Sequence, residues 1–403
     1  MTLPWAAVLA CAIAAAPQQA PDAHADAERL ARNGARAEAL QRFQTIAAEN
    51  PNDVDARLWI ARLHMWMGHP ALAVNVLESI LASNPTNVEA LTGVAIAHMN
   101  DGNTAVAEEA LTRAYQIMPE SAEVLAALGR LYRFEGRLTL ALAYYDRAVQ
   151  QSPADRDIRD ARDIVFAQRA HRVEAGYLFE HFNRDVTDTN SGAFDVNLRA
   201  ADRARVHAGV ETQRKFDRTE SRGGGGVEWS VNRSAVLRGG GLFSSGSVVL
   251  PRADATVDLD VTHRQLTWLL SGRYLHFSTS DAGVGAIGVA WSASDDTTLT
   301  VRYFRSETAF NATSEHAGNN AGSIQLSQRV GRPVRLYAGY ARGYESFQNV
   351  TAETLTQRGA HTFSGGATIA GGPRLAISPS LELQRRDDRS RVTSFFLTFV
   401  HRF

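Results

Sequence analysis

Three histidines in the second half of the chain lie close in sequence to residues that could complete a hydrolytic site. A histidine beside a serine or a carboxylate can act as a general base. The candidate pairs are His207 with Glu211, His276 with Ser271, and His361 with Ser364. Along a strand, spacings of four and five residues place the members of the first two pairs well apart. The sequence contains no G-x-S-x-G or H-E-x-x-H motif. We therefore predict that the protein is not an enzyme.

The sequence offers few groups for a metal or a cofactor, and we predict none. Cys11 is the only cysteine, which excludes disulfides and cysteine-based metal sites. The run Gly223–Gly226 lacks the strand-and-helix context of a phosphate-binding loop. We interpret it as a loop or as a kink in a barrel wall.

The N-terminus has the features of a secretory signal. Trp5–Ala16 is an apolar run of the length of a signal core, too short to span a bilayer. The A-x-A motif at Ala23–Ala25 predicts cleavage with a mature start near Asp26. Met1–Pro4 contains no Lys or Arg, so the true start could lie upstream. We assign residues 1–25 to a signal peptide.

Charge and hydropathy limit the remaining classes of partner. Lys and Arg number 42 and Asp and Glu 43, so no positive field points to nucleic acid. After residue 25 no run approaches the 18 apolar residues of a transmembrane helix. If the chain crosses a membrane, it must do so as a closed β-barrel, which also satisfies its backbone hydrogen bonds in lipid.

Residues 26–172 repeat with a period of 34. Three ladders have this spacing: Gly34, Gly68, Gly102 and Gly136; Ala39, Ala73, Ala107 and Ala141; Pro51, Pro85, Pro119 and Pro153. The alanine lets two helices approach, the glycine permits the turn between them, and the proline ends each unit. The pattern resembles the tetratricopeptide repeat, a stack of helix pairs. Asp155–Arg172 is charged and helical in period, and we expect it to form a capping helix.

Stacks of this kind present a concave groove that usually binds another protein. The candidate partner-binding residues on the repeat frame are Arg62, Met65, Trp66, Asn100, Arg130 and Arg133. Trp66 would be an aromatic anchor, and the arginines would hold the partner. Alternatively, Met65 and Trp66 only pack between neighbouring helices. His64 and His98 share one repeat position, and we interpret them as packing residues rather than metal ligands.

From residue 173 the apolar period changes to two. In Ala255–Thr262, aliphatic side chains alternate with Thr and Asp, as in a wall between lipid and an aqueous lumen. The predicted lumen-lining residues are Asp195, Arg199, His207, Glu211, Glu228, Asp258, Asp260, Arg273, Arg302 and Arg335. Because both signs are present, opposed charges could either plug the lumen or line a narrow polar path.

Residues 173–403 divide into 14 predicted strands, with 12 as the alternative because glycine-rich stretches blur the boundaries. Every second connection is short, as in outer-membrane barrels. The last strand, Arg391–Phe403, places Phe395, Leu397, Phe399 and Phe403 on one face. It resembles the C-terminal signal of such barrels, which implies the barrel-assembly machinery as a partner. An even count returns Phe403 to the side of the repeats, next to the strand at 173–182.

This architecture is similar to the YaiO family of outer-membrane barrels and, more loosely, to exopolysaccharide export porins. The predicted fold class is α+β multidomain, an all-α tetratricopeptide solenoid followed by an antiparallel transmembrane β-barrel. The resemblance places residues 26–172 in the periplasm and residues 173–403 in the outer membrane, surrounded by its lipid. It implies that the repeats recruit a periplasmic or envelope protein and that a small polar pore supports polysaccharide export. The alternatives are a non-conducting anchor for envelope complexes and a barrel hydrolase.

Overall fold

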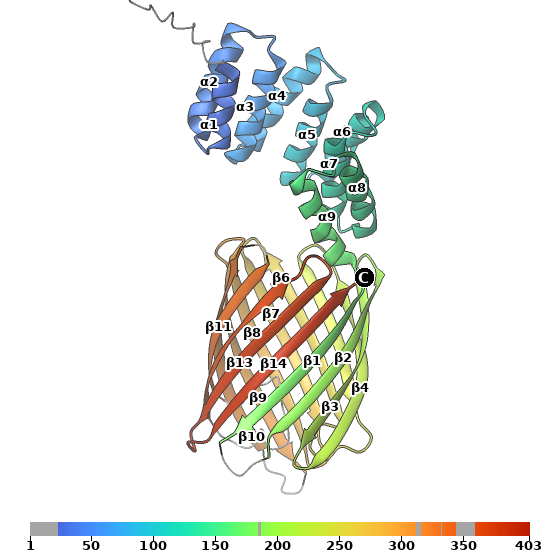
Figure 1. Cartoon of the computed structure of the whole chain (residues 1–403), viewed down its shortest axis with the longest axis vertical. Helices are drawn as coiled ribbons and strands as arrows, with labels where there is room; N and C mark the ends of the chain where they lie inside the picture. Colours follow the sequence, from blue (N-terminus) through green and yellow to red (C-terminus); the bar gives the residue numbers. More distant parts are fainter. Residues whose placement is uncertain (1–22, 184–186, 312–315, 332, 344–358) are drawn as a thin grey trace, which may run out of the picture. The chain divides into compact units, whose positions relative to one another are not determined.

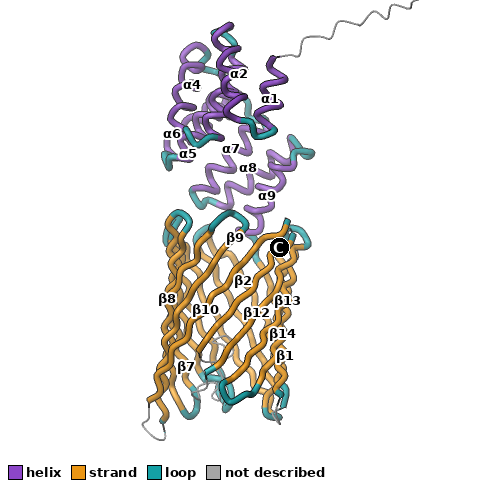
Figure 2. The backbone as a smooth tube through the Cα atoms, turned by 90° about the vertical axis from the view of Figure 1, so that its left-hand side faces the viewer, coloured by secondary structure: helices purple, strands orange, loops and turns teal. Residues whose placement is uncertain are grey.

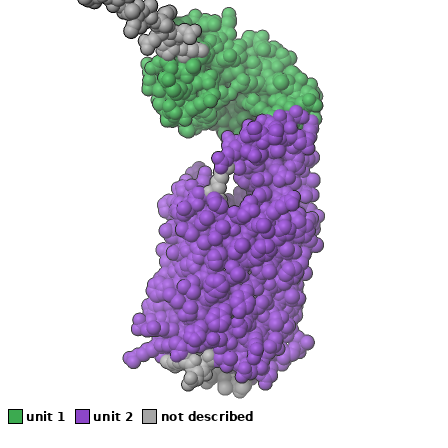
Figure 3. All heavy atoms as spheres, in the orientation of Figure 1, with its two compact units in different colours: residues 1–131 green, residues 132–403 purple. Residues whose placement is uncertain are grey.

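The computed structural model describes residues 23–183, 187–311, 316–331, 333–343 and 359–403. The chain forms two compact units, residues 1–131 and 132–403, which Figure 3 colours separately. The first unit is helical, and the second contains the last helices and the whole barrel (Figures 1 and 2). No helix in the described residues is long and apolar enough to cross a membrane.

Helices fill the first part of the chain. In the described residues they are α1 (Ala23–Arg32), α2 (Arg36–Glu49), α3 (Val54–Trp66), α4 (Pro70–Ser83), α5 (Val88–Asn100), α6 (Thr104–Ile117), α7 (Ala122–Phe134), α8 (Leu138–Gln151) and α9 (Arg156–Arg169). The predicted cleavage motif forms the start of α1, and residues 1–22 of the predicted signal peptide lie outside the described residues. The predicted domains meet at residue 172, where the first strand begins, whereas the compact units divide after Leu131.

The 34-residue ladders correspond to recurring positions of the helix pairs. The ladder glycines all have positive φ, between 76° and 88°, and each follows the first helix of a pair. This conformation is strained for any residue with a Cβ. The ladder alanines have no exposed surface, because each lies where a larger side chain would force neighbouring helices apart. The tetratricopeptide architecture predicted from these ladders is confirmed.

A fourth ladder, which the sequence analysis did not detect, stabilises the helix starts. Its members are Asp53, Asn87, Ser121 and Asp155, and each side chain accepts a hydrogen bond from a backbone N–H of the helix that follows. The distance is 2.9 Å from Ala56 N to Asp53 Oδ1 and 2.8 Å from Ala90 N to Asn87 Oδ1. Each N-cap of this kind stabilises its helix by about 1 kcal/mol.

The core of the first unit is organised around Phe43. Its ring is fully buried and stacks on Trp59, with ring centroids 5.4 Å apart and an interplanar angle of 3°. Ala27, Ala31 and Leu63 belong to the same buried cluster. The aromatic pair therefore joins the first three helices into one core.

In the part of the chain that the structure describes, fourteen antiparallel strands close into a barrel, as predicted. They are β1 (Arg172–Phe182), β2 (Thr189–Ala201), β3 (Ala204–Lys215), β4 (Arg218–Ser230), β5 (Ala235–Phe243), β6 (Ala253–His263), β7 (Leu266–His276), β8 (Ser280–Ser292), β9 (Thr297–Phe310), β10 (His316–Val330), β11 (Val334–Gly343), β12 (Ala360–Ala370), β13 (Leu375–Arg386) and β14 (Arg391–Arg402). The first strand pairs with the last, from Arg172 opposite Arg402 to Phe182 opposite Val392. His171 and Phe403 extend this ladder by two backbone hydrogen bonds of 3.0 and 2.9 Å.

The two ends of the barrel differ in their connections. We call the end at which β1 begins and β14 ends the helix-side rim, because α9 leads into it (Figure 1). Its turns are short, such as Asp202–Arg203 between β2 and β3. At the opposite end, β3 and β4 are joined by a tight turn at Phe216 and Asp217, both with positive φ. The long connection between β11 and β12 lies almost wholly outside the described residues.

The glycine run Gly223–Gly226 lies inside β4, so of its two interpretations, a loop or a kink in the barrel wall, the loop is wrong. Across the sheet, Gly225 pairs with Gly241 and Gly226 with Gly240, whereas Gly223 and Gly224 pair with Phe243 and Leu242. A Cβ at Gly224 would lie 1.9 Å from the carbonyl oxygen of Gly241, and one at Gly226 would lie 2.5 Å from that of Gly239. The wall at β4 and β5 therefore depends on an approach that only glycine permits.

We expect Phe43→Ala to destabilise the first unit by about 3–5 kcal/mol, because it empties the centre of a packed aromatic core. The measurement is thermal unfolding of the full-length protein in detergent, followed by circular dichroism at the helical band. Leu72→Ala is the control, because Leu72 on α4 is 48% exposed, and its effect should stay within about 0.5 kcal/mol. The same midpoint for both variants would contradict the assignment of the core.

Candidate functional site

The barrel wall separates polar from apolar side chains by the alternation of its strands. Large apolar residues such as Val257, Ile287 and Val301 are about half exposed on one face, and polar residues occupy the alternate positions. The ten residues predicted to line the lumen all stand at positions that alternate with the exposed apolar ones. The aromatic face of the last strand lies on the apolar side, with Phe395, Leu397, Phe399 and Phe403 between 38% and 53% exposed.

A buried ion-pair chain follows the wall from β3 to β7. Arg222 on β4 donates to Glu211 on β3 at 2.9 Å and to Asp254 on β6 at 3.0 Å. Asp254 also accepts from Arg273 on β7 at 2.6 Å. The side chains of Arg222 and Asp254 are only 7% and 5% exposed, and pairing offsets the cost of burying their charges.

A second set of charges pairs nearer the helix-side rim. Arg238 on β5 bridges Glu228 on β4 at 3.1 Å and Asp260 on β6 at 2.7 Å. On β3, His207 lies 3.1 Å from Asp195 on β2. These pairs connect neighbouring strands, so they fix side chains along the wall.

The other side of the lumen is lined by small, uncharged polar groups. A cavity of about 590 Å³ is bounded by strands β6 to β13. Its hydroxyl and amide groups include Thr300, Ser323, Gln325, Thr362 and Ser364. Four charged residues also reach this cavity, namely Asp258, Arg273, Arg302 and Glu382. This surface offers many donors and acceptors with little net charge.

At the helix-side rim, charged residues of the barrel bind the start of α8 and the end of α9. Asp202, in the β2–β3 turn, accepts hydrogen bonds from the backbone N–H of Thr139 at 3.2 Å and from its hydroxyl at 2.8 Å, at the start of α8. Arg205 donates to the carbonyls of Gln168 and Ala170 at 3.0 Å each, at the end of α9. Acidic groups at helix starts and basic groups at helix ends both complement the helix dipole. We call these contacts the helix clamp.

Arg199, predicted as a lumen-lining charge, is part of this clamp. It donates to the carbonyls of Asp202 (3.0 Å) and Gln168, and its own N–H donates to His171 Nδ1 at 3.0 Å. Its guanidinium therefore holds the end of α9. Sequence spacing could not indicate this contact, because Gln168 lies 31 residues away.

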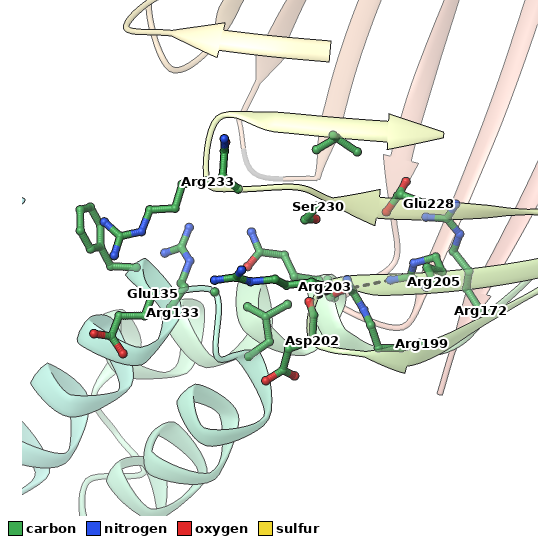
Figure 4. A pocket seen from close by; sticks show the side chains of 17 residues that line it. Arg133, Glu135, Arg172, Arg199, Asp202, Arg203, Arg205, Glu228, Ser230 and Arg233 are labelled. Atoms are coloured by element: carbon green, nitrogen blue, oxygen red, sulfur yellow. Dashed lines mark hydrogen bonds between the residues drawn. The ribbon is translucent and has the colours of Figure 1, made fainter. Parts of the chain in front are cut away.

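A rim pocket of about 440 Å³ lies between the helix clamp and the β4–β5 turn (Figure 4). Its charged lining residues are Arg133, Arg172, Arg199, Arg203, Arg205, Arg233, Glu135, Asp202 and Glu228. Arg233 lies over the ring of Phe134 at 4.3 Å from its centroid. This pocket was not predicted, although the sequence does place arginines in the short turns, as at Arg203 and Arg233.

The predicted partner-binding residues lie in both units. In the first, Arg62 forms an ion pair with Glu89 and lies 4.5 Å from the centroid of Trp59. Trp66 is 41% exposed, Met65 is half-buried, and Asn100 and Arg130 are exposed. In the second unit, Arg133 lines the rim pocket.

The three hydrolytic pairs adopt other arrangements. His207 contacts Asp195, while Glu211 binds Arg222. Ser271 and His276 face opposite sides of β7, and His361 and Ser364 face opposite sides of β12, since each pair differs by an odd number of positions. No pair therefore has the geometry of a base beside a nucleophile.

In the described residues, no group of three or more His, Cys, Asp or Glu side chains could hold a metal ion. His64, interpreted as a packing residue, lies beside His69 with ring centroids 6.2 Å apart. Burial, together with the charge of His69, lowers the pKa of His64 below its ordinary value. Its imidazole is therefore neutral at physiological pH.

We expect Arg205→Ala to loosen the end of α9 and the start of β1. Loss of charged hydrogen bonds worth about 1.5–3 kcal/mol should accelerate amide exchange in residues 160–175 by about ten- to hundredfold. Hydrogen–deuterium exchange of the full-length protein measures this change. Arg203→Ala is the matched control, since Arg203 is exposed and makes no ion pair within the described residues. Equal exchange in both variants would contradict the helix clamp.

Family models match three parts of the chain. Residues 30–95 and 95–156 match tetratricopeptide repeats, and residues 170–322 match the YaiO membrane beta-barrel domain. No curated protein matches the chain.

The chain also resembles several solved structures. TTC0263, a thermophilic TPR protein of Thermus thermophilus, is 22% identical over 36% of this chain and 96% of its own, with a TM-score of 0.28. MamA residues 41-end from Desulfovibrio magneticus RS-1 is 19% identical over 36% of this chain and 81% of its own, with a TM-score of 0.30. A bacterial polysaccharide outer membrane secretin is 8% identical over 59% of this chain and 99% of its own, with a TM-score of 0.43. Scores this low carry no argument about function.

The family models and the barrel together confirm the assignment made from the sequence. The chain carries tetratricopeptide repeats followed by a YaiO membrane beta-barrel domain, the architecture of an outer-membrane barrel protein.

Proposed function

We propose that this protein is a non-enzymatic component of polysaccharide export. Its repeats recruit a periplasmic or envelope protein, and its barrel provides a narrow polar path across the outer membrane. The observation that carries the proposal is the cavity bounded by β6–β13, whose hydroxyl and amide lining can exchange hydrogen bonds with sugar hydroxyls.

The arrangement of charges supports a path rather than a plug. Arg238 pairs with Glu228 and Asp260 on the strands directly beside it. The chain through Arg222 likewise stays within β3–β7. Ion pairs that follow the wall leave the space beside β8–β13 to the cavity, whose two acidic and two basic lining residues balance in charge.

The orientation follows from the loops. In outer-membrane barrels the short turns face the periplasm and the longer loops face outward. The helix-side rim has short turns and holds the end of α9. On this basis we place the helices in the periplasm, where a partner could deliver a polymer to the barrel.

The second candidate is a non-conducting anchor for envelope complexes. It is favoured by one contact, from Arg222 on β4 to Asp254 on β6, which spans the intervening strand β5. Side chains that bridge over a strand occupy lumen space, and further bridges of this kind would seal the barrel. The repeats would then act as a scaffold held at the membrane.

Ion conductance in planar bilayers separates the two candidates. We expect stepwise currents from the wild-type protein and a clearly lower unit conductance for Ser364→Trp, because Ser364 lines the cavity and an indole at this position would occupy lumen space. Phe363→Trp is the control, because Phe363 is 55% exposed on the apolar face. Bilayers that stay silent with folded wild-type protein would support the anchor.

Partner recruitment is tested with the exposed groove residues. We expect Trp66→Ala combined with Arg130→Glu to abolish capture of an envelope protein by tagged full-length protein, because hot-spot aromatics and arginines dominate such interfaces. Leu72→Ala is a control for the exposed face of the helix α4. Capture that is undiminished in the double variant would show that partners bind elsewhere.

A further inference from the structure

We propose that the rim pocket binds the carboxylate or phosphate groups of an acidic polysaccharide, and so selects the polymer that enters the barrel. The choice of ligand rests on the proposed export function, whereas the anion site rests on the pocket alone. The pocket contains six arginines and three carboxylates, so its positive charge is in excess.

The carboxylates of the rim pocket are already bound to other groups. Glu135 pairs with Arg137 at 3.4 Å, and Glu228 pairs with Arg238 at 3.1 Å. Asp202 is occupied by the start of α8 in the helix clamp. Glu228 and Asp202 act over a longer distance on Arg199, and Glu228 also acts on Arg205, but no direct ion pair within the described residues joins any of the three to an arginine of the pocket.

Three of the arginines lack such a partner. Arg133, Arg203 and Arg233 are exposed, and no carboxylate of the described residues lies within ion-pair distance of them. Arg233 is held in place by the ring of Phe134, which reduces the entropy that it would lose on binding an anion. Guanidinium groups suit carboxylates and phosphates alike, because their paired N–H donors match two oxygens.

Two further arginines of the pocket bind main-chain carbonyls rather than a carboxylate. Arg199 and Arg205 donate to main-chain carbonyls in the helix clamp, and a carbonyl carries no formal charge. Arg205 is only 4% exposed, and the Nε of Arg199 is buried without a hydrogen-bond partner among the described residues. The burial of Arg205 reduces the solvent screening of its charge and so strengthens its attraction for an anion.

The position of the pocket favours a polymer in water over a lipid headgroup. A second cavity of about 330 Å³ shares Arg172, Arg205 and Glu228 with the rim pocket and extends to Asp195 and His207. These residues stand at the polar, lumen-facing positions of their strands. A ligand bound in the rim pocket would thus face the lumen rather than the apolar outer surface.

The charge balance changes beyond the rim. In the cavity bounded by β6–β13, Asp258 and Glu382 balance Arg273 and Arg302. An acidic chain would be attracted at the rim and then meet a wall without net charge, which would not hold it. Strong binding at one point followed by weak binding allows a polymer to move on.

Isothermal titration of the full-length protein in detergent tests the proposal. The probes are octagalacturonate, the neutral sugar maltooctaose and dihexanoyl-phosphatidylglycerol, a short-chain lipid. We expect octagalacturonate to bind more tightly than the other two probes, and its affinity to fall as the salt concentration increases. The double variant Arg203→Gln/Arg233→Gln should bind octagalacturonate at least about tenfold more weakly than the wild-type protein, which corresponds to a loss of about 1.4 kcal/mol of binding free energy.

The matched control is Arg264→Gln/Arg329→Gln, which removes two charges near the same rim but outside the pocket, and it should bind like wild type. Equal affinity of both double variants would overturn the proposal. Equal affinity of the wild-type protein for octagalacturonate and maltooctaose would also overturn it. Tighter binding of dihexanoyl-phosphatidylglycerol than of octagalacturonate would assign the pocket to a lipid headgroup instead.

The bilayer measurement keeps this inference separate from the proposed function. A silent barrel that still binds octagalacturonate through Arg203 and Arg233 would overturn export and leave the anion site standing. A conducting barrel without arginine-dependent binding would overturn the anion site alone.

Discussion

The pairing of β1 with β14 is the constraint on which the rest of the barrel depends. A strand edge in lipid would leave backbone groups without hydrogen bonds, so the sheet must close. Closure between antiparallel first and last strands requires an even number of strands and brings both ends of the barrel chain to one rim. His171 and Phe403 complete the ladder there. The helix α9, which directly precedes β1, must therefore meet the barrel at the rim where β14 ends.

That meeting point explains the distribution of charge. The backbone groups at the ends of α8 and α9 need partners, and the nearest rim supplies Asp202, Arg199 and Arg205. Basic residues bound to helix carbonyls keep their charge, whereas basic residues in the lumen are balanced by carboxylates, as Arg222 is by Glu211 and Asp254. The same packing requirement that docks the helices therefore leaves positive charge at the mouth of the barrel.

Periodicity in the sequence was sufficient to predict the fold. The glycine and alanine ladders predicted the helix pairs, because each position has one structural requirement, and strand alternation predicted the barrel and its closing pair. The N-cap ladder through Asp53 and Asn87 has the same period and was detectable. The helix clamp could not be detected in the sequence, because Asp202 and Thr139 are 63 residues apart and belong to segments with different periodicities. Arg199 stands at a polar position of β2, but its partner on α9 could only be found in three dimensions.

The rim pocket, which we propose selects the polymer, lies at the mouth of the lumen through which the polymer would pass. Arg133, Arg203 and Arg233 belong to turns and to the end of α7, which can change without altering strand register, whereas the lumen residues are fixed by pairing across neighbouring strands. Substitution of Arg203 or Arg233 would change the charge at the mouth and leave the wall intact. Substitution of Arg222 would instead leave Asp254 short of a partner in a buried site, where an unpaired charge is strongly destabilising. Ligand preference in this architecture can therefore vary at the rim while the barrel stays the same.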